Sequence, residues 1–341
     1  MIARTQMACH PRLWMCRASM RWVGARRYRC VMVWSARIRI TCAGRPLMQL
    51  ENIYPIILAG GRGKRLRPMT SYRKPKPFVT LRSNYNLLQE TLIRASGLAP
   101  PTIVCQQMYI PKVEFSLRSL ARYDIFPRAI VAEPYVRSTA PAIGAACLSL
   151  APYMTFVVLP SDHIMDNEGA LMKAISEAGD IVNEHGGFVS IGVKPRGASR
   201  RFGYLHKGAR VDDTQIYHSE HFMEKPSSEY AGQFVKSGEY LWNTGIFVGR
   251  VLDYLSAFQA IEREYLYFLR KSFENSRNFE IYYELKRDYY HKIPAMSVDR
   301  AILEQCTQRY AAEHDGYWDD AGTWPSYLKL YLMRLLGIIK R

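Results

Sequence analysis

Residues Ile53–Val79 read IYPIILAGGRGKRLRPMTSYRKPKPFV. An apolar run, Ile53–Leu58, leads directly into Gly60, Gly61 and Gly63 and then into a dense cluster of basic side chains. Glycines let the backbone curl and aim N–H groups at phosphate oxygens. The spacing fits neither GxxxxGK(S/T) nor GxGxxG, and a glycine-rich turn can also be a plain tight connection. The basic cluster nevertheless favours polyphosphate binding after a strand. Its members are Arg62, Lys64, Arg65, Arg67, Arg73, Lys74 and Lys76.

Short apolar segments alternate with helical patterns from Met48 onward. For example, Asn86–Ser96 carries apolar residues at four-residue spacing, as in an amphipathic helix. Such alternation predicts an α/β protein with a Rossmann-like mixed, mostly parallel sheet flanked by helices. Ligands bind such sheets at the carboxyl ends of the strands. The predicted strands are Ile53–Leu58, Thr102–Gln106, Ala129–Ala132, Thr155–Leu159 and Phe188–Val193.

The first 47 residues differ in composition from the rest. Residues 1–50 hold ten Arg and no Lys, Asp or Glu, so they carry +10 of the net charge of +17. They lack both the apolar core of a secretory signal and the serine content of a mitochondrial transit peptide. We interpret residues 1–47 as an unstructured basic extension or a mis-assigned start before Met48; a targeting segment and a true basic arm are the alternatives. Without these residues the charge is modest, so we expect no nucleic acid as a partner.

The cysteines and the hydropathy pattern bear on location. The seven cysteines are scattered and form no CxxC pair, which favours reduced thiols in a cytoplasmic protein. No stretch approaches the roughly 18 uninterrupted apolar residues of a transmembrane helix. We therefore expect a cytoplasmic protein without stable membrane association.

Several motifs resemble one family, in register from Ile53 to about Tyr327. The segment Leu58–Val79 resembles the signature of the sugar-phosphate nucleotidyltransferases, GG-x-G-x-R-L-x-P followed by P-K. The stretch AEPYVRSTAPAIGAA, Ala132–Ala146, resembles the EP-x-x-R-N-T-A-P-A motif of the mannose-1-phosphate guanylyltransferases within that family. Later family motifs resemble VVLPSDH (Val157–His163), FMEKP (Phe222–Pro226), GEYLWNTGIF (Gly238–Phe247), SVDRAILE (Ser297–Glu304) and GYWDDAGTW (Gly316–Trp324).

The resemblance implies an activity and a set of site residues. The implied reaction transfers GMP from GTP to α-D-mannose 1-phosphate and yields GDP-mannose, a precursor for polysaccharide biosynthesis, and pyrophosphate. The alternatives are transfer to a different sugar 1-phosphate, another nucleotide, or a catalytically silent sugar-nucleotide-binding homologue. The implied catalytic residues are Arg65, Lys76 and Asp162; the implied nucleotide-binding residues are Leu58, Ala59, Gly60, Gly61, Gly63, Arg137, Thr139 and Pro141; the implied sugar-phosphate-binding residues are Gly203, Glu224, Lys225 and Asn243.

The implied reaction also suggests a metal cofactor, Mg²⁺. A sugar phosphate is already a nucleophile, so the protein must mainly hold two polyanions together and neutralise charge. Mg²⁺ takes one or two carboxylates and otherwise phosphate and water oxygens. We expect Asp162, just past an apolar strand, and Asp320, in a Gly- and Trp-rich turn, as its ligands. The alternatives are Asp162 as a helix N-cap, Asp320 as a solvated turn residue, and Asp319 in place of Asp320.

The resemblance also implies a domain organisation. It indicates a nucleotidyltransferase domain over 48–327, with a nucleotide half to about residue 200 and a sugar-phosphate half after it. Ser138 stands where the family motif has Asn, which affects the finer contacts of the site. Long family members continue into a cupin-type isomerase domain; we expect no cupin domain and no isomerase activity here.

The last residues predict a C-terminal helix over 328–341. An apolar stripe of this strength needs a partner surface, because large exposed patches are rare on monomers. We expect it to pack on its own domain and to contribute to a homodimer; an anionic membrane surface is the alternative. The stripe consists of Leu328, Tyr331, Leu332, Leu335 and Leu336, extended by Ile338 and Ile339.

Overall fold

The computed structural model describes residues 50–61, 63–81 and 83–335. All of them belong to one structural unit, Ile38–Arg341. The predictions made for residues 1–47, for Arg62 and for the tail beyond residue 335 lie outside the described residues.

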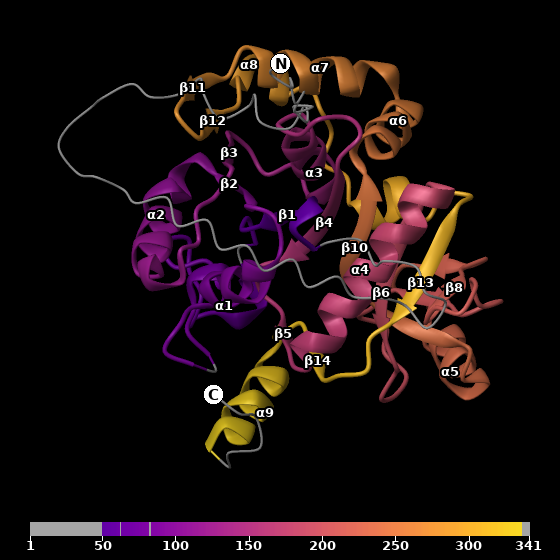
Figure 1. Ribbon diagram of the computed structural model, residues 1–341. Coiled ribbons are helices and arrows are strands. Elements are labelled where there is room, and N and C mark those ends of the chain that lie inside the picture. Colours follow the sequence, from indigo (N-terminus) through magenta and orange to yellow (C-terminus); the bar gives the residue numbers. More distant parts are fainter. Residues whose placement is uncertain (1–49, 62, 82, 336–341) are drawn as a thin grey trace, which may run out of the picture. The chain divides into compact units, whose positions relative to one another are not determined.

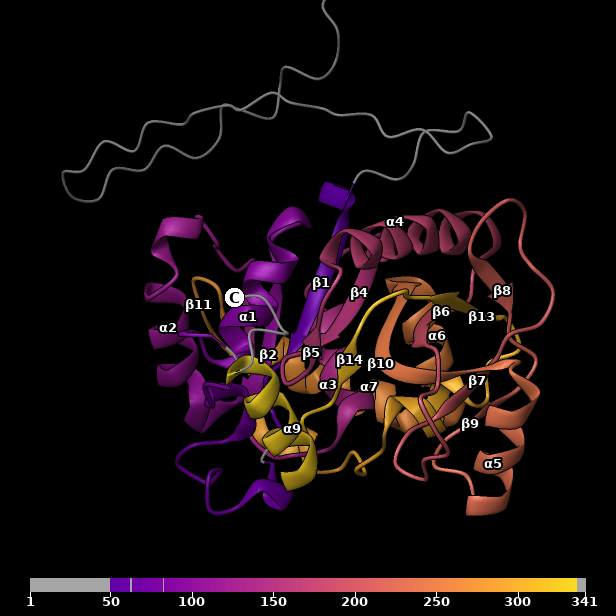
Figure 2. The same ribbon diagram turned by 90° about the horizontal axis from the view of Figure 1, so that it is seen from below.

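The main sheet has 12 strands in the described residues. Its order is β11-β12-β3-β2-β1-β4-β10-β6-β13-β8 (Figure 1). In addition, β7 pairs with β10, and β9 pairs with β7; both are labelled in Figure 2. The strands are β1 (Ile53–Leu58), β2 (Thr102–Gln106), β3 (Ala129–Glu133), β4 (Thr155–Pro160), β6 (Phe188–Val193), β7 (Tyr204–His206), β8 (Ile216–His218), β9 (Phe222–Met223), β10 (Tyr240–Arg250), β11 (Arg277–Phe279), β12 (Tyr282–Glu284) and β13 (Arg309–Glu313).

The sheet is mixed but mostly parallel, as predicted. Strands β12, β3, β2, β1 and β4 are neighbours and pair in parallel. Strand β10 runs antiparallel to both β4 and β6, and β6 pairs in parallel with β13. All five predicted strands are present; β3 and β4 each continue one residue further than predicted.

Helices cover both faces of the sheet, and the alternation of side chains along β1 explains why. Ile53 and Ile57 point into one buried cluster, with Leu88, Leu171 and other residues of α1, α2 and α4. Ile56 points into the other cluster, with residues of α3, α6 and α7. The helices are α1 (Leu87–Arg94), α2 (Ile110–Arg118), α3 (Thr139–Cys147), α4 (Glu168–His185), α5 (Ser228–Ser237), α6 (Val251–Ile261), α7 (Arg263–Glu274), α8 (Arg287–Tyr290) and α9 (Trp324–Leu335).

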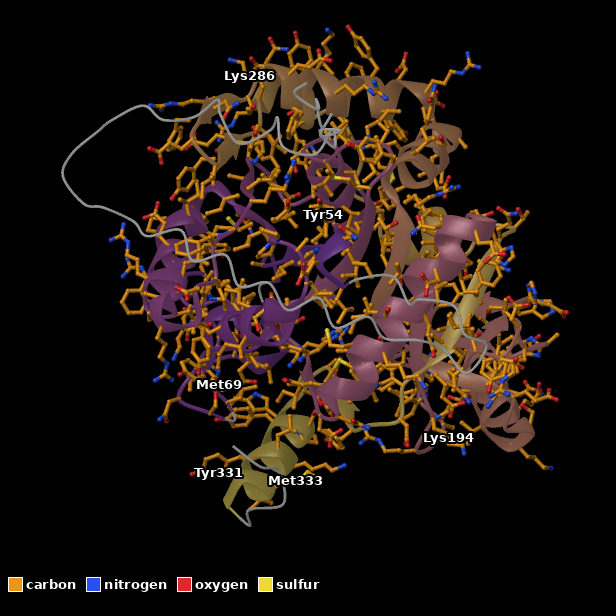
Figure 3. All side chains as sticks on the ribbon, in the orientation of Figure 1. Tyr54, Met69, Lys194, Lys286, Tyr331 and Met333 are labelled. Atoms are coloured by element: carbon orange, nitrogen blue, oxygen red, sulfur yellow. The ribbon has the colours of Figure 1, made fainter. Side chains whose placement is uncertain are left out.

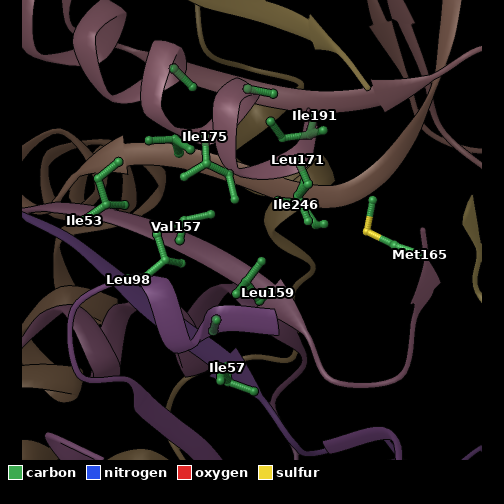
Figure 4. Packing of buried hydrophobic residues seen from close by; sticks show 14 of the residues in the cluster. Ile53, Ile57, Leu98, Val157, Leu159, Met165, Leu171, Ile175, Ile191 and Ile246 are labelled. Carbon is green, nitrogen blue, oxygen red and sulfur yellow. The ribbon is translucent and has the colours of Figure 1, made fainter. Parts of the chain in front are cut away.

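The buried cluster around Ile53 and Ile57 forms the hydrophobic core between the sheet and α4. Figure 4 shows Ile53, Ile57 and Val157 from the sheet packed with Leu171 and Ile175 of α4. Burial of aliphatic side chains of this kind contributes about 1.5–3 kcal/mol each. The two faces together confirm the predicted fold class, in which a strand buried on both sides reads as a continuous apolar run. In the part of the chain that the structure describes, no helix is both long enough and apolar enough to span a membrane.

A second, two-stranded sheet joins distant segments. β5 (Ile164–Met165) pairs antiparallel with β14 (Trp318–Asp319), with Asp319 opposite Ile164. Both views place the two short strands side by side (Figure 1, Figure 2). Because β5 follows Asp162 and β14 precedes Asp320, the pairing brings these two carboxylates together.

The C-terminal helix is present, but its packing differs from the prediction. It begins at Trp324, and its Leu330 side chain is buried against Val79, Leu81 and neighbouring side chains. Leu328, Tyr331 and Leu332, which were expected to pack on the domain, are 53%, 43% and 55% exposed. Figure 3 shows Tyr331 on this helix. The predicted packing on the chain's own domain is therefore wrong for Leu328, Tyr331 and Leu332, and the helix contacts the domain through Leu330 instead. The other side chains of the predicted stripe lie outside the described residues, and the homodimer stays a prediction.

Candidate active site

A cavity of about 440 Å³ lies at the carboxyl ends of the central strands. Leu58, Glu133 and Pro160, the last residues of β1, β3 and β4, line it. This is the position that the parallel part of the sheet predicts for a ligand. The other polar or charged lining residues are Ser138, Thr139, Asp162, His163, Arg201, Glu224, Asn243, Thr244, Asp299 and Asp320.

The glycine loop after β1 brings the backbone close to the carboxylates. A Cβ atom on Gly61 would lie 3.8 Å from Asp162 Oδ2, and one on Gly60 would lie 3.9 Å from Glu133 Oε2. Gly63 has a φ of 64°, and a Cβ atom there would come within 2.8 Å of Lys76 Cβ. Gly63 does not line the cavity; it lets the loop pack against Lys76.

Lys76 connects the two predicted metal ligands. Its side chain is buried, and its ammonium lies 2.7 Å from Asp162 Oδ2 and also donates to the backbone carbonyl of Asp320. Burial would raise the pKa of Asp162, but the charge of Lys76, the neighbouring His163 and the hydrogen bond from Lys76 hold that pKa below its ordinary value. Burial also lowers the pKa of His163, against the attraction of Asp162. Asp162 therefore stays a carboxylate.

The structure separates Asp320 from its neighbour Asp319. Asp320 lines the cavity and accepts a hydrogen bond of 2.6 Å from Arg201. Asp319 instead accepts from Ala321 N at 2.7 Å and from the hydroxyl of Ser326, so it holds the turn that leads into α9. Asp162 is not a helix N-cap either, because α4 is capped by Asn167.

Three of the four predicted sugar-phosphate residues meet in the same cavity. Gly203, Glu224 and Asn243 line it, and a Cβ atom on Gly203 would lie 2.7 Å from Glu224 Oε2. Asn243 donates 2.9 Å to Asp299, whose pKa burial and the nearby Glu224 raise to about 6. Lys225 is not a lining residue; half of its side chain is exposed, and it contacts Glu224 from a backbone with φ of 53°.

The predicted nucleotide-binding residues divide into two groups. Leu58, Gly60, Gly61 and Thr139 line the cavity. Thr139 Oγ1 also accepts from Val298 N at 2.8 Å, which ties the start of α3 to the segment 296–298. The other four do not line the cavity. Ala59 and Pro141 are buried, Gly63 packs against Lys76, and Arg137 donates a hydrogen bond of 2.6 Å to the carbonyl of His291.

Arg65 lies apart from the buried residues of the site. It is exposed on a short turn, Lys64–Leu66, and does not line the cavity. The catalytic role implied for it remains a prediction.

Two carboxylates and an arginine of the lining were not assigned from the sequence: Glu133, Asp299 and Arg201. Glu133 and Asp299 lie inside the quoted motifs AEPY and SVDRAILE, so the motifs held the signal. Burial raises the pKa of Glu133 to about 8, although the hydrogen bond that it accepts from Tyr290 lowers it. Arg201 lies in the loop just before β7, and its neighbour Arg200 is equally basic, so nothing local distinguished it.

The donor set fits a divalent cation of the Mg²⁺ type. Asp162 and Asp320 are carboxylates that border one cavity, and both are paired with cationic side chains, Lys76 and Arg201. Among the described residues no group of three or more His, Cys, Asp or Glu could hold a metal ion. Two carboxylates suffice for Mg²⁺, which keeps water and phosphate oxygens as further ligands.

Comparison with known proteins identifies the class. The family model described as nucleotidyl transferase matches residues 54–334. The chain therefore belongs to the nucleotidyl transferase family, whose members generally use a divalent metal ion.

Individual relatives are similar over most of this chain. A mannose-1-phosphate guanylyltransferase of Escherichia coli is 33% identical over 80% of this chain and 58% of its own length. The xanthan biosynthesis protein XanB of Xanthomonas campestris pv. campestris is 32% identical over 82% of this chain and 59% of its own length. A solved structure from Thermus thermophilus, described as a mannose-1-phosphate geranyltransferase, matches with a TM-score of 0.69 and 26% identity, over 82% of this chain and 79% of that one. The chain thus spans less than two thirds of the length of the two relatives matched by sequence.

Proposed function

We propose that this protein transfers GMP from GTP to α-D-mannose 1-phosphate, forming GDP-mannose and releasing pyrophosphate. The observation that carries the proposal is the convergence of Lys76, Asp162 and Asp320 beside the glycine loop, at a cavity that Glu224 and Asn243 also line. Such a cavity suits two phosphate-bearing substrates that react with each other. The similarity to a guanylyltransferase for mannose 1-phosphate supports the choice of nucleotide and sugar.

The chain's own residues divide the work by position. Gly60 and Gly61 follow the end of β1, and their backbone N–H groups bind phosphate oxygens of the nucleotide. Lys76 neutralises charge on the triphosphate as pyrophosphate leaves, which requires its ammonium to turn from Asp162 to phosphate oxygens. Arg65, on the exposed turn after the loop, adds to this neutralisation. A divalent ion held by Asp162 and Asp320 would supply further charge neutralisation on the reacting phosphates.

The sugar side orients the nucleophile. Glu224 and Asn243 accept from and donate to sugar hydroxyls, and Lys225 binds the phosphate of the sugar. No side chain is needed as a general base, because the attacking oxygen of a sugar phosphate is already anionic. The acceleration then comes from holding two anions in line and from neutralising their charge.

The proposed location is the cytoplasm, and the proposed assembly is a homodimer. The three cysteines of the described residues, Cys105, Cys147 and Cys306, are free thiols, which supports a reducing compartment such as the cytoplasm. A homodimer would cover the exposed apolar side chains of α9.

A substrate panel tests the proposed function. Pyrophosphate release is measured with GTP, ATP, UTP and dTTP, each combined with the 1-phosphates of mannose, glucose and galactose and supplied with Mg²⁺. We expect the highest kcat/KM for GTP with mannose 1-phosphate. A higher value for another pair would reassign the substrates within the same reaction. Sugar-nucleotide binding without any pyrophosphate release would instead support a catalytically silent homologue.

A further inference from the structure

Arg201 is an arginine of the cavity that the proposed mechanism does not use. It belongs to the loop between β6 and β7, which also carries Lys194, Arg196 and Arg200. Lys194 and Arg200 are exposed, and Figure 3 labels Lys194 on this loop. Arg196 donates 2.6 Å to the carbonyl of Trp318 and therefore has a structural partner. Among the described residues that line the cavity, Arg201 is the only lysine or arginine.

The contacts of Arg201 leave part of its guanidinium unused. One terminal nitrogen donates 2.6 Å to Asp320 Oδ1, and the other donates to Thr323 Oγ1 across a longer 3.4 Å. Nε has no hydrogen-bond partner among the described residues. The guanidinium lies 5.1 Å from the centre of the Phe202 ring, and about a third of the side chain, 35%, is exposed. A planar fork of five N–H donors is thus held beside the cavity with spare donors.

The loop around Arg201 connects the two sides of the site. Two residues later, the carbonyl of Gly203 accepts 2.8 Å from Asn243 N, and Gly203 packs against Glu224. Arg201 thus contacts Asp320, a proposed metal ligand, and lies two residues before Gly203, which contacts the residues proposed to hold the sugar. The phosphate of a sugar 1-phosphate has to lie between these two sides for its oxygen to attack the nucleotide.

The charges of the lining call for a cation at this place. The lining carries the carboxylates Asp162, Glu224, Asp299 and Asp320. A doubly charged phosphate that enters beside such carboxylates needs a permanent positive partner. Arginine meets that need best, because its fork matches phosphate oxygens in a bidentate way.

We infer that Arg201 is a phosphate-binding residue that exchanges partners: it pairs with Asp320 in the free protein and binds the phosphate of the sugar 1-phosphate when Asp320 engages a divalent ion. The inference rests on the proposed function for the identity of the sugar phosphate. Its physical basis is that the Arg201 guanidinium and a divalent metal ion compete for the same Asp320 carboxylate. Releasing Arg201 at the moment when the phosphate arrives couples the two binding events, and such a coupling is reciprocal.

The exchange is tested by binding rather than by turnover. Mn²⁺ is the metal probe, and its free concentration is followed by electron paramagnetic resonance. Mannose 1-phosphate affinity is measured by calorimetry with and without Mn²⁺. The variants are Arg201→Gln, Arg201→Lys and the matched control Arg200→Gln, which removes a neighbouring, exposed arginine. Thermal unfolding checks that all variants are folded.

We expect opposite changes in the two affinities for Arg201→Gln. Mn²⁺ alone should bind several-fold more tightly, because Asp320 loses a competing cation. Mannose 1-phosphate should bind at least about tenfold more weakly, as expected for the loss of a charge-assisted hydrogen bond. The mutual strengthening of Mn²⁺ and sugar phosphate should disappear. Arg201→Lys should restore part of the sugar-phosphate affinity, and Arg200→Gln should match the wild type.

The outcomes distinguish this inference from the proposed function. If the wild type prefers another hexose 1-phosphate, the sugar assignment fails, and the same titrations with that sugar decide the role of Arg201. If the wild type binds none of them, the phosphate half of the exchange is overturned, and the Mn²⁺ titration decides only whether Arg201 and the metal ion compete for Asp320. Equal Mn²⁺ affinity in the wild type and Arg201→Gln overturns it, as does unchanged sugar-phosphate affinity in that variant.

Discussion

Lys76 and Asp162 form a 2.7 Å ion pair, although 86 residues separate them in the chain. The pair depends on the glycine loop, because Gly63 packs against the Lys76 side chain where a Cβ atom would clash. The same ammonium reaches the backbone of Asp320. One buried cation therefore holds both predicted metal ligands in place, and it is also the group that the proposed mechanism turns toward the triphosphate.

Asp162→Asn tests the metal side of this arrangement. The substitution keeps the shape of the side chain but removes the charge that a divalent ion needs. We expect the fold to remain and turnover to fall by about two orders of magnitude or more, as for the loss of an electrostatic stabiliser of the transition state. Pyrophosphate release measures the effect.

A matched control is Asp253→Asn. Asp253 is also ion-paired at 2.7 Å, with Arg250, and its side chain is 23% exposed against 27% for Asp162, but it does not line the cavity. The turnover of the Asp253→Asn variant should equal that of the wild type. Near-normal turnover in Asp162→Asn itself would remove Asp162 from the mechanism.

Lys76→Ala and Lys225→Ala distinguish the two proposed phosphate sites. Loss of Lys76 should lower kcat and weaken the use of GTP, whereas loss of Lys225 should mainly raise KM for the sugar phosphate. Steady-state kinetics with each substrate varied in turn measures both effects. Lys207→Ala is the control, because Lys207 pairs with Glu313 at 3.0 Å outside the cavity lining. Exchanged effects would mean that the two substrates bind in the reverse orientation.

The strands and Asp162 could be predicted because their signals are local. An apolar run such as Thr155–Leu159 indicates a buried strand, and a polar residue just past it lies at the carboxyl end, where ligands bind. The position of Asp162 follows from this rule without any knowledge of distant contacts. The same holds for the glycine loop after β1.

The pairing of Arg201 with Asp320 could not be predicted, because it depends on long-range contacts. Asp320 reaches the cavity through the pairing of β5 with β14, two strands of two residues each that are too short to show a period. The buried face of α9 was predicted wrongly for a related reason. Leu328, Leu330 and Leu332 are all apolar, and only the surrounding residues decide that Leu330 packs inward.

Glu133 should make the stability depend on pH. Burial raises its pKa from 4.5 to about 8, so the folded state favours the protonated acid. The stabilisation is complete below pH 4.5 and is lost as the pH rises toward about 8, by up to roughly 1.4 kcal/mol per pH unit. Glu133→Gln should remove this part of the slope, because an amide stays neutral and can still accept from Tyr290.

Urea unfolding of the wild type and Glu133→Gln between pH 5 and pH 9 measures this difference. The control is Glu220→Gln, an exposed carboxylate, whose curve should run parallel to that of the wild type. Parallel curves for Glu133→Gln would show that Glu133 ionises alike in the folded and unfolded states.

Leu330 and Leu332 form a matched pair on α9. Leu330 is 4% exposed and Leu332 is 55% exposed. Leu330→Ala should lower the free energy of unfolding by about 2–4 kcal/mol, whereas Leu332→Ala should change it by less than about 0.5 kcal/mol. Sedimentation of the same variants tests the homodimer: a lower mass for Leu332→Ala would indicate that the exposed face joins two copies. A large loss of stability in Leu332→Ala without a change in mass would contradict the assigned packing of this helix.

Ser138→Gly should stabilise the protein. Ser138 precedes α3 with φ of 65° and ψ of −163°, a region that glycine occupies readily and other residues occupy at a cost of about 1–3 kcal/mol. Its side chain makes no capping hydrogen bond, so little is lost with the hydroxymethyl group. The greater conformational freedom of glycine in the unfolded chain offsets about 0.5–1 kcal/mol of the strain that is relieved. We expect a net gain of about 1 kcal/mol in the free energy of unfolding by urea.

Ser227→Gly is the control: Ser227 caps α5 at φ of −63° and accepts from Tyr230 N, so its replacement should cost a few tenths of a kcal/mol. A loss of stability in Ser138→Gly would mean that the serine is not strained and that its side chain stabilises the loop before α3.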